Sequence, residues 1–298
     1  MKNNLLLFLV VIGSCIVGFG GYYLYETNYL NKASDSSSSS SSTSSPKDNN
    51  ETPTNLDLTS TAVIDLYNLI TIKINNQSTI EPLFYQNKLI TLSSISSEDQ
   101  LRLAYFYASQ TNDFASFSLN SCEDIKSYPS FVNYYNSCLQ NGLSSLNLSA
   151  SITINQTFLN YDFQHLFGSE NNLTNKSFSF SQYGVNCDYN ESQKSYLCLI
   201  TNSITPSVST NYNALKSAQQ YSDRIEITDY YASCITKSDN TLTCYADSKN
   251  QTFLKDNITL DSSGHLPFMF QYAQQYKHIF KLDSNGKYYW YSTEPLTK

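Results

Sequence analysis

Apolar residues in the stretch STAVIDLYNLI recur with the period of a helix. Four of them fall at i, i+3, i+4 and i+7: Val63, Leu66, Tyr67 and Ile70. This spacing places the four side chains on one face of an amphipathic helix. Thr59 or Ser60 stands where such a helix needs an N-cap. The first element of the folded part is therefore predicted to be a helix.

Two more helices are predicted before residue 143. In SSEDQLRLAYFYAS the helical spacing falls on Leu101, Ala104, Tyr105 and Ala108. Ser97 and Gln100 are placed for a capping box there. The third helix should run from Pro129 to Gly142, because proline favours the first helical position and glycine the position after the last. Its apolar face would carry Phe131, Tyr135, Cys138 and Leu139.

The period of the pattern then changes to two. Apolar and polar residues alternate through Leu146, Leu148, Ala150, Ile152 and Ile154, which predicts a strand with one solvent-facing side. A short helix over about 156–167 should end at Gly168. The remaining chain reads mostly as strands. The closing pair, KHIFKLDSNGKYYWYST, has Asn285-Gly286 where a two-residue type I′ hairpin needs it.

These patterns predict an α+β domain over 56–298, with a helical part at 56–142 and a sheet-rich part at 143–298. Consecutive strands after the helices favour a largely antiparallel sheet with the helices packed on one face. This order of elements resembles that of NTF2-like and cystatin-like domains. Such a resemblance concerns the fold and implies no function.

The N-terminal region reads as a membrane anchor followed by a linker. Residues 5–25 carry no charge, and 21 helical residues span roughly 31 Å, enough to cross a bilayer core. Lys2 precedes this segment, so residues 1–4 should be cytoplasmic and the C-terminal domain extracytoplasmic, in a single-pass protein of the cell membrane. Residues 26–55 include seven consecutive serines, Ser36–Ser42, and should form a flexible linker.

Cys15 leaves a second interpretation of the anchor open. Residues 12–15, Ile-Gly-Ser-Cys, form a loose lipobox, in which Cys15 would be acylated. The chain nevertheless stays apolar for about ten residues beyond Cys15, as a membrane span does. An uncleaved signal-anchor is therefore the favoured interpretation.

Composition narrows the classes of function. The chain has 298 residues, a net charge of −7 and only two arginines. Nucleic acid binding needs clustered Lys and Arg, so we expect no nucleic acid partner. Charged residues make up 14% of the chain and aromatic residues another 14%, including 25 tyrosines. This balance is typical of a folded, sheet-rich domain with many half-buried tyrosines.

Six cysteines follow the anchor, and they are expected to form three disulfides. Six cysteines allow fifteen pairings, and the sequence alone does not choose among them. Local geometry favours the nearest neighbours, Cys122–Cys138, Cys187–Cys198 and Cys234–Cys244. Cys234 and Cys244 are equidistant from Asp239, where a hairpin can turn. An extracytoplasmic setting favours disulfides. The chain has no C-x-x-C motif and three widely spaced histidines, so neither a metal site nor a cofactor is expected.

Candidate catalytic motifs are incomplete. The stretch Thr241–Cys244, TLTC, resembles the T-L-x-T-C strand of sortases but is one residue short and lacks the following arginine. The contiguous DSSGH of 261–265 favours a turn over a triad, whose members usually come from separate segments. The acid pairs Glu98-Asp99 and Glu123-Asp124 could serve a hydrolase only if the fold brought distant carboxylates into one cleft.

Tyrosine clusters are the remaining signal for a binding surface. They occur at Tyr134-Tyr135, at Tyr230-Tyr231 and, with the single tryptophan, at Tyr288-Tyr289-Trp290-Tyr291. Adjacent residues of a strand face opposite sides, so Tyr289 and Tyr291 should share one face and Tyr288 and Trp290 the other. One pair would pack on the core, and the other could form an aromatic contact surface.

Several segments resemble a loose group of uncharacterised, single-pass, extracytoplasmic proteins of low-GC bacteria. They are the MKNN start, the serine linker, SSEDQLRLAY, HLFG and the closing YKHIFKLDSNGKYYWYSTEP. The resemblance implies a location and no activity. The expectation is a non-enzymatic binding module held at the membrane by residues 5–25, with an envelope protein or a wall glycan as partner. The alternative is a cell-envelope hydrolase whose carboxylates converge in three dimensions.

Overall fold

The computed structural model describes residues 52–74, 77–111, 115–116, 119–180, 183–201, 209–262, 264–267 and 269–297. The chain divides into two units at residue 51, and the description that follows concerns the second, 51–298. The predicted anchor at 5–25, with Cys15, and nearly all of the predicted linker at 26–55 lie outside the described residues. None of the helices in the described ranges is both long and apolar enough to cross a membrane.

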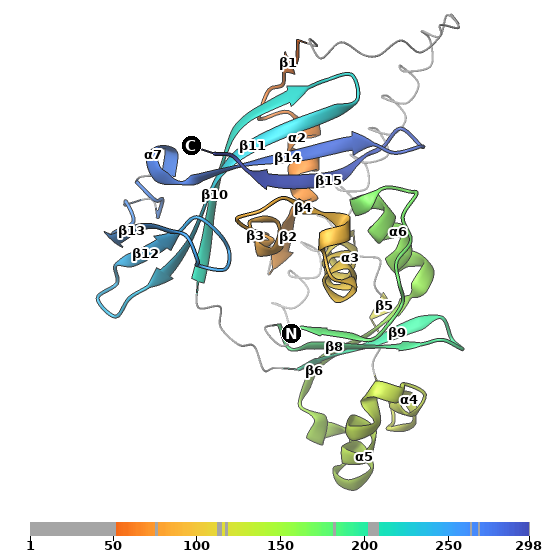
Figure 1. Ribbon diagram of the computed structural model, residues 1–298. Coiled ribbons are helices and arrows are strands. Elements are labelled where there is room, and N and C mark those ends of the chain that lie inside the picture. Colours follow the sequence, from red (N-terminus) through yellow and green to blue (C-terminus); the bar gives the residue numbers. More distant parts are fainter. Residues whose placement is uncertain are drawn as a thin grey trace, which may run out of the picture. The chain divides into compact units, whose positions relative to one another are not determined.

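The second unit is a mixed α+β domain with antiparallel sheets, as its patterning predicts. The larger sheet has eight strands (Figure 1). Six of them follow one another across the sheet in the order β1 (Thr54–Asn55), β10 (Ser209–Gln220), β11 (Arg224–Thr236), β14 (Gln274–Leu282), β15 (Tyr288–Pro295) and β4 (Ile90–Thr91). The two others extend from β11 as β12 (Leu242–Tyr245) and β13 (Phe253–Ile258).

A second sheet has five strands, again antiparallel. Their order is β5 (Ala115–Ser116), β6 (Leu148–Asn155), β9 (Ser195–Thr201), β8 (Val185–Asn190) and β7 (Phe178–Phe180). A separate hairpin pairs β2 (Thr71–Ile74) with β3 (Gln77–Ile80). Strands β2 to β5 lie within 56–142, so this part of the chain also contributes strands to the sheets.

The predicted helices are present in the structure. The longer ones are α2 (Thr61–Asn68), α3 (Ser97–Thr111), α5 (Val132–Asn141) and α6 (Gln156–Phe167). Single turns occur at η1 (Pro82–Phe84), η2 (Leu92–Ser94), α4 (Glu123–Lys126), η3 (Pro129–Phe131), η4 (Leu143–Leu146) and α7 (Met269–Tyr272). Ser60 caps α2 by accepting a hydrogen bond from the Val63 amide at 3.4 Å.

The main core lies between the two sheets. In Figure 1, α3 and α6 lie between the β14–β15 pair and the β6–β9–β8 strands. Trp290 of β15 and Tyr196 of β9 are both buried in this single cluster, together with Phe167 of α6. The helices are therefore shared by two sheets, whereas the sequence predicted helices on one face of one sheet. Residues 143–298 supply strands to both sheets, and their alternation does not reveal which sheet each strand joins.

A second, smaller core lies on the opposite face of β9. There Leu197 and Leu199 pack against residues of α4, η3 and α5, among them Ile125 and Phe131. Figure 1 shows α4 and α5 on the far side of β6, β8 and β9 from α3. Both faces of β9 are thus covered, which agrees with the uninterrupted burial of its first five residues.

Three local expectations need correction. Leu139 is 58% exposed on α5, although the helical spacing placed it with the buried Phe131 and Cys138. The cap of α3 is Ser96, whose Oγ accepts from the Asp99 amide at 3.1 Å, one residue before the predicted capping box. Both errors arise because the exact end of a helix, and the face that is covered, depend on neighbouring elements.

The third correction concerns the closing hairpin. The turn spans 283–287: the Gly286 amide donates to the Asp283 carbonyl at 3.0 Å, and the Asp283 amide donates to the Lys287 carbonyl at 2.8 Å. Positive φ occurs at Gly286 (73°) but not at Asn285, so this is not a two-residue type I′ turn. The Asp283 carboxylate stabilises the longer loop by accepting from the Asn285 and Lys287 amides.

Candidate functional site

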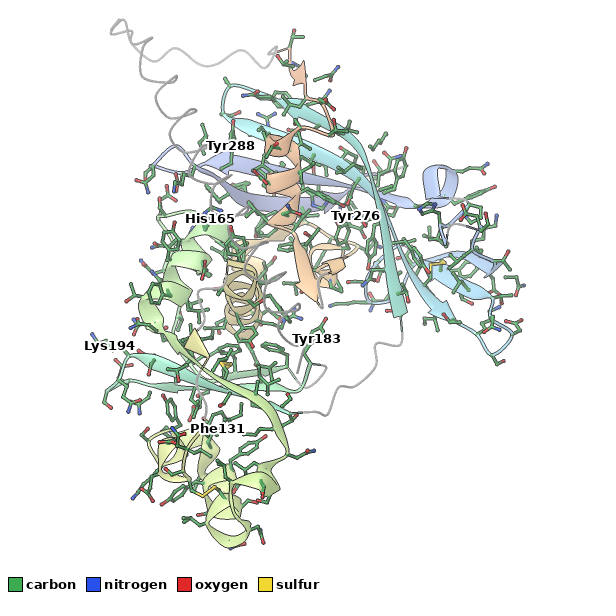
Figure 2. The ribbon with its side chains drawn as sticks, turned by 180° about the vertical axis from the view of Figure 1, so that it is seen from behind. Phe131, His165, Tyr183, Lys194, Tyr276 and Tyr288 are labelled. Atoms are coloured by element: carbon green, nitrogen blue, oxygen red, sulfur yellow. A yellow bond between two sulfur atoms is a disulfide. The ribbon has the colours of Figure 1, made fainter. Side chains whose placement is uncertain are left out.

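The predicted aromatic surface of β15 is mostly covered. Trp290 is 1% exposed, and its ring lies 4.7 Å from the ring of Phe84 and 5.7 Å from that of Phe167. Tyr288, labelled in Figure 2, is half-buried and packs against the same core. This pair therefore faces the helices, and Trp290 contributes nothing to an exposed contact surface.

The other pair leaves one exposed ring. Tyr289 is half-buried, and its ring is so close to Gly168 that a Cβ there would lie 3.2 Å from it. Tyr291 is 43% exposed and has the Nζ of Lys281 3.6 Å from its ring centroid. Tyr291 is also the extra residue of a β-bulge, since its two neighbours in β15 pair with consecutive residues of β14. Strand β15, which the structure describes throughout, therefore carries no broad aromatic platform.

A buried polar network occupies the centre of the eight-stranded sheet. The Nε2 of His278 lies 3.1 Å from Oδ1 of Asp229, and its Nδ1 lies 2.8 Å from Oγ1 of Thr293. Trp290 donates its indole N–H to the same Thr293 oxygen at 2.9 Å. The hydroxyl of Tyr85 donates to Oδ2 of Asp229 at 2.7 Å. The polar atoms of these side chains thus satisfy one another inside the core.

Burial raises the pKa values of the tyrosine hydroxyls in this network. Desolvation raises the pKa of the Tyr85 hydroxyl well above its usual value, and the negative charge of Asp229 raises it further. The same two causes act on Tyr67, whose hydroxyl also donates to Asp229. Both phenols therefore stay protonated and remain donors to the carboxylate.

The acid, imidazole and hydroxyl of this network have the composition of a catalytic triad but not its accessibility. Asp229, His278 and Thr293 are each 0% exposed. A nucleophile must reach its substrate, and Thr293 cannot. We therefore regard the network as part of the core. It escaped detection in the sequence because Asp229, His278 and Thr293 lie on three different strands and form no local motif.

A surface groove of about 280 Å³ lies where α5 and η3 meet β7, β8 and the first turn of α3. Its floor includes Phe131, labelled in Figure 2, with Phe178 and Cys187. Its polar lining consists of Glu98, Ser130, Tyr134, Ser177, Ser179 and Asn186. The groove therefore combines hydroxyl groups, an amide, a carboxylate and aromatic rings.

A buried carboxylate behind the groove fixes two of the lining serines. Asp188 is 1% exposed, and it accepts a hydrogen bond from the Ser130 amide at 2.6 Å and another from the Ser177 hydroxyl. The Ser130 hydroxyl in turn donates to that of Ser177 at 3.1 Å. This part of the wall is consequently held in place before any ligand binds.

The other walls are joined by longer contacts. The Ser179 amide lies 3.4 Å from Oε1 of Glu98, and the Asn186 side-chain amide lies 3.4 Å from the Tyr134 hydroxyl. Bonds of this length are weak, so these groups can exchange them for bonds to a ligand. Among the described lining residues Glu98 is the one charged side chain, which gives the groove a negative character.

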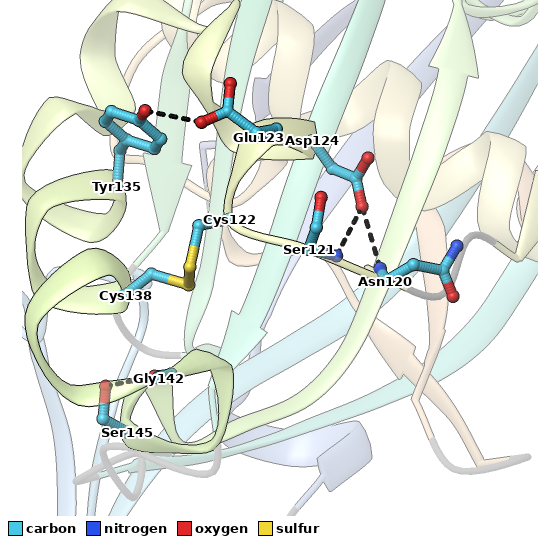
Figure 3. The surroundings of a disulfide bond; sticks show 9 residues. All are labelled: Asn120, Ser121, Cys122, Glu123, Asp124, Tyr135, Cys138, Gly142 and Ser145. Carbon is cyan, nitrogen blue, oxygen red and sulfur yellow. Dashed lines mark hydrogen bonds between the residues drawn. A yellow bond between two sulfur atoms is a disulfide. The ribbon is translucent and has the colours of Figure 1, made fainter.

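Sequence reasoning identified part of this site for other reasons. Glu98 belongs to one of the two acid pairs and Tyr134 to a tyrosine cluster, but their sequence neighbours do not line the groove. Asp99 pairs with Arg102 at 3.3 Å. Tyr135 donates to Oε1 of Glu123 at 2.8 Å (Figure 3). The serines and Asn186 have no pattern that would single them out.

The three disulfides join the nearest-neighbour pairs. Cys122–Cys138 links the start of α4 to α5, with the two Cα atoms 5.7 Å apart (Figure 3). Cys187–Cys198 joins opposed residues of β8 and β9, and Cys234–Cys244 joins opposed residues of β11 and β12. Cys244 is thus engaged in a disulfide and offers no free thiol, which excludes sortase-like chemistry at TLTC.

The remaining candidates carry no site. Asp261 and His265 close an exposed turn, with 3.8 Å between Oδ2 and Nδ1 and side-chain exposures of 44% and 79%. Within the described ranges, no group of three or more His, Cys, Asp or Glu side chains is arranged to hold a metal ion.

Comparisons of the chain with protein families, with curated proteins and with solved structures find no match.

Proposed function

We propose that this protein is a binding module held on the extracytoplasmic face of the cell membrane. Residues 5–25 would form the single span, residues 1–4 would be cytoplasmic, and residues 26–55 would form the linker. The three disulfides support this placement, since structural disulfides form in oxidising compartments. We also propose that the eight-stranded sheet and its helices form an NTF2-like or cystatin-like domain.

The ligand would bind in the groove between α5 and the β7–β8 hairpin, and a wall glycan fits its chemistry best. The supporting observation is the lining: hydroxyls, one amide and the ring of Tyr134 around about 280 Å³. Small-molecule sites usually enclose about 300–1,000 Å³, so one or two sugar rings would fill this one. We place the ligand in the groove and not on the aromatic residues of β15, because among those residues only Tyr291 is well exposed.

A cell-envelope hydrolase remains the alternative. Glycoside hydrolysis uses two carboxylates on opposite sides of the scissile bond. Glu98 lines the groove, whereas Asp188 lies behind it and is engaged by Ser130 and Ser177. This arrangement favours binding over hydrolysis.

Retention of glycans by the immobilised protein tests the proposal. The full chain, with its disulfides formed, would be held in detergent micelles and incubated with solubilised envelope glycans of the producing cell. The wild type should retain fragments and return them uncut. Loss of the aromatic ring in Tyr134→Ala should weaken retention about three- to tenfold, since ring contacts are worth about 0.5–1.5 kcal/mol. Tyr135→Ala is the matched control and should retain fragments normally, because Tyr135 contacts Glu123 instead.

Equal retention by both tyrosine variants would show that the groove is not the binding site. Shortened fragments would establish the hydrolase alternative. Retention of an envelope protein in place of glycans would also contradict the glycan assignment. Thermal unfolding of each variant separates loss of binding from loss of the fold.

A further inference from the structure

We infer that the groove selects a saccharide with a free, protonated amino group, and that Glu98 binds this group. The inference deepens the proposed function and rests on it. It follows from the placement of charge around the groove.

The carboxylate of Glu98 has no cationic partner among the described residues. It lies exposed in the first turn of α3, at the rim of the groove. The nearest cation along the helix, Arg102, pairs with Asp99 at 3.3 Å and with Glu81 at 3.1 Å. In the part of the chain that the structure describes, the backbone donor to Glu98 is the Ser179 amide, 3.4 Å away. Glu98 can therefore bind a ligand cation without first giving up a strong contact.

Asp188 adds a second negative charge behind the same wall. The Ser130 amide and the Ser177 hydroxyl, which donate to it, are both neutral. Its field reaches nearby groups, since it contributes to the raised pKa of Tyr128, after the larger effect of burial. Neither Lys nor Arg lines the described groove. A concave wall with one sign of charge concentrates ions of the opposite sign, so this groove attracts cations and repels anionic sugars.

The rest of the lining suits the hydroxyl groups of a sugar. Ser179, the Asn186 amide and the Tyr134 hydroxyl can each donate and accept. The hydroxyl hydrogens of Ser130 and Ser177 are already donated within the wall, so these two oxygens serve as acceptors. The Tyr134 ring offers an apolar face for the C–H groups of a pyranose. A ligand that combines an ammonium group with several hydroxyls satisfies both parts of the lining. An N-acetylated sugar has the hydroxyls but lacks the charge.

Calorimetric titration of the full chain in detergent micelles distinguishes these ligands. The probes are a fully deacetylated glucosamine tetrasaccharide and its N-acetylated counterpart, at about pH 6, where an amine is protonated. The deacetylated probe should bind at least about tenfold more tightly, because a hydrogen bond between charged groups is stronger than one between neutral groups. Added salt should reduce this preference, since the groove is open to solvent.

Glu98→Gln removes the charge and keeps the shape of the side chain, so it should abolish the preference for the deacetylated probe. Glu123→Gln is the matched control: it changes the net charge equally, and Glu123 also lies in the first turn of a helix, but away from the groove. This variant should keep the preference. A simple diamine serves as a competitor without sugar hydroxyls and should displace the tetrasaccharide poorly.

The outcomes separate the two proposals. Equal binding of both probes by the wild type, unchanged in Glu98→Gln, overturns the amino-sugar inference and leaves the glycan-binding groove intact. Equal competition by the diamine overturns the saccharide part of the inference. Binding of neither probe overturns the inference, and if envelope glycans are not retained either, the proposed function falls with it.

Discussion

His278 and Asp229 lie on neighbouring strands and meet through a 3.1 Å contact that is closed to solvent on all sides. In the sheet register His278 pairs with Ile227 on β11 and with Thr293 on β15. Asp229 is therefore its diagonal neighbour, two residues along β11. The contact joins the central strands of the sheet through side chains in addition to the backbone ladder.

Substituting Thr293 by valine tests the energetic weight of this network. Thr293→Val keeps the shape of the side chain but leaves the Trp290 indole N–H and the Nδ1 of His278 without their shared partner. The free energy of unfolding should fall by about 1–3 kcal/mol, the cost of buried unsatisfied polar groups. Chemical denaturation, followed by circular dichroism, measures the change.

The matched control is Thr228→Val, on the outward-facing side of β11. It should alter the free energy of unfolding by no more than about 0.5 kcal/mol. Equal changes in the free energy of unfolding would mean that the effect of Thr293→Val comes from β-strand propensity and not from the network.

Gly168 is predicted to be intolerant of any side chain. It follows α6 with φ at 94°, and a Cβ at this position would lie 2.8 Å from Oε2 of Glu170 and 3.2 Å from the ring of Tyr289. Gly168→Ala should therefore cost about 1–3 kcal/mol, from backbone strain and from the displaced neighbours. The shift of the thermal unfolding midpoint provides the measurement.

A substitution at Gly142 separates the cost of backbone strain from the cost of displaced neighbours. It ends α5 with φ at 82°, and a Cβ there would meet nothing within 4 Å. Gly142→Ala should cost about 1 kcal/mol from the backbone alone. A smaller shift for Gly168→Ala than for Gly142→Ala would contradict the packing of Tyr289 described above.

Removal of the Cys122–Cys138 disulfide should loosen the groove. The bond closes a loop with a sequence separation of 16, which corresponds to about 3 kcal/mol on the chain-entropy model. The double variant Cys122→Ala/Cys138→Ala should become more sensitive to proteolysis between residues 119 and 147. Retention of glycan fragments should fall with it, because η3 and α5 supply Phe131 and Tyr134 to the groove.

The double variant Cys234→Ala/Cys244→Ala is the control for this experiment. Its loop is of similar size, with a sequence separation of 10, and its cysteines belong to a different core cluster. Stability should fall by a comparable amount while glycan retention stays at the wild-type level. Loss of retention in both variants would show that retention follows global stability.

Protonation of His165 should make stability depend on pH. Its ring stacks on Tyr107 with 5.1 Å between centroids, and burial, followed by the charge of Lys287, lowers its pKa, while Asp283 opposes the shift. Between this lowered pKa and the unfolded value of about 6.5, the unfolded chain binds more protons than the folded one. Stability should therefore fall as the pH drops below about 6.5.

His165→Gln should flatten this part of the curve of unfolding midpoint against pH. His265→Gln, with its ring in an exposed turn, should leave the wild-type slope. An identical slope in wild type and His165→Gln would rule out the assignment.

Much of the local structure could be predicted from the sequence. The helix α6 covers 156–167 and ends at Gly168, as its pattern and C-terminal glycine indicate. Cys234 and Cys244 pair across β11 and β12, as their equal spacing from Asp239 favours. Strands of two residues, such as β1 and β4, escaped prediction because they are defined by the partner strand and not by a period of their own.

The candidate site was predictable only in part. Glu98 and Tyr134 stand out by residue type, but the groove exists because a helical segment after β5 packs against one face of β9 while α3 and α6 pack against the other. That two-sided burial is a tertiary property. The sequence of β9, SYLCLIT, does not show whether helices cover one face of the strand or both. Ser177 and Asn186 acquire their place only through this packing.

The three disulfides each connect cysteines that are neighbours along the chain, at separations of 16, 11 and 10 residues. No bond has to wait for a distant segment to be synthesised. Under oxidising conditions, each pair can close as soon as its own hairpin or helix pair has formed. Of the fifteen pairings that six cysteines allow, this is the one that requires the least reshuffling, so oxidative folding of this chain should depend little on a disulfide isomerase.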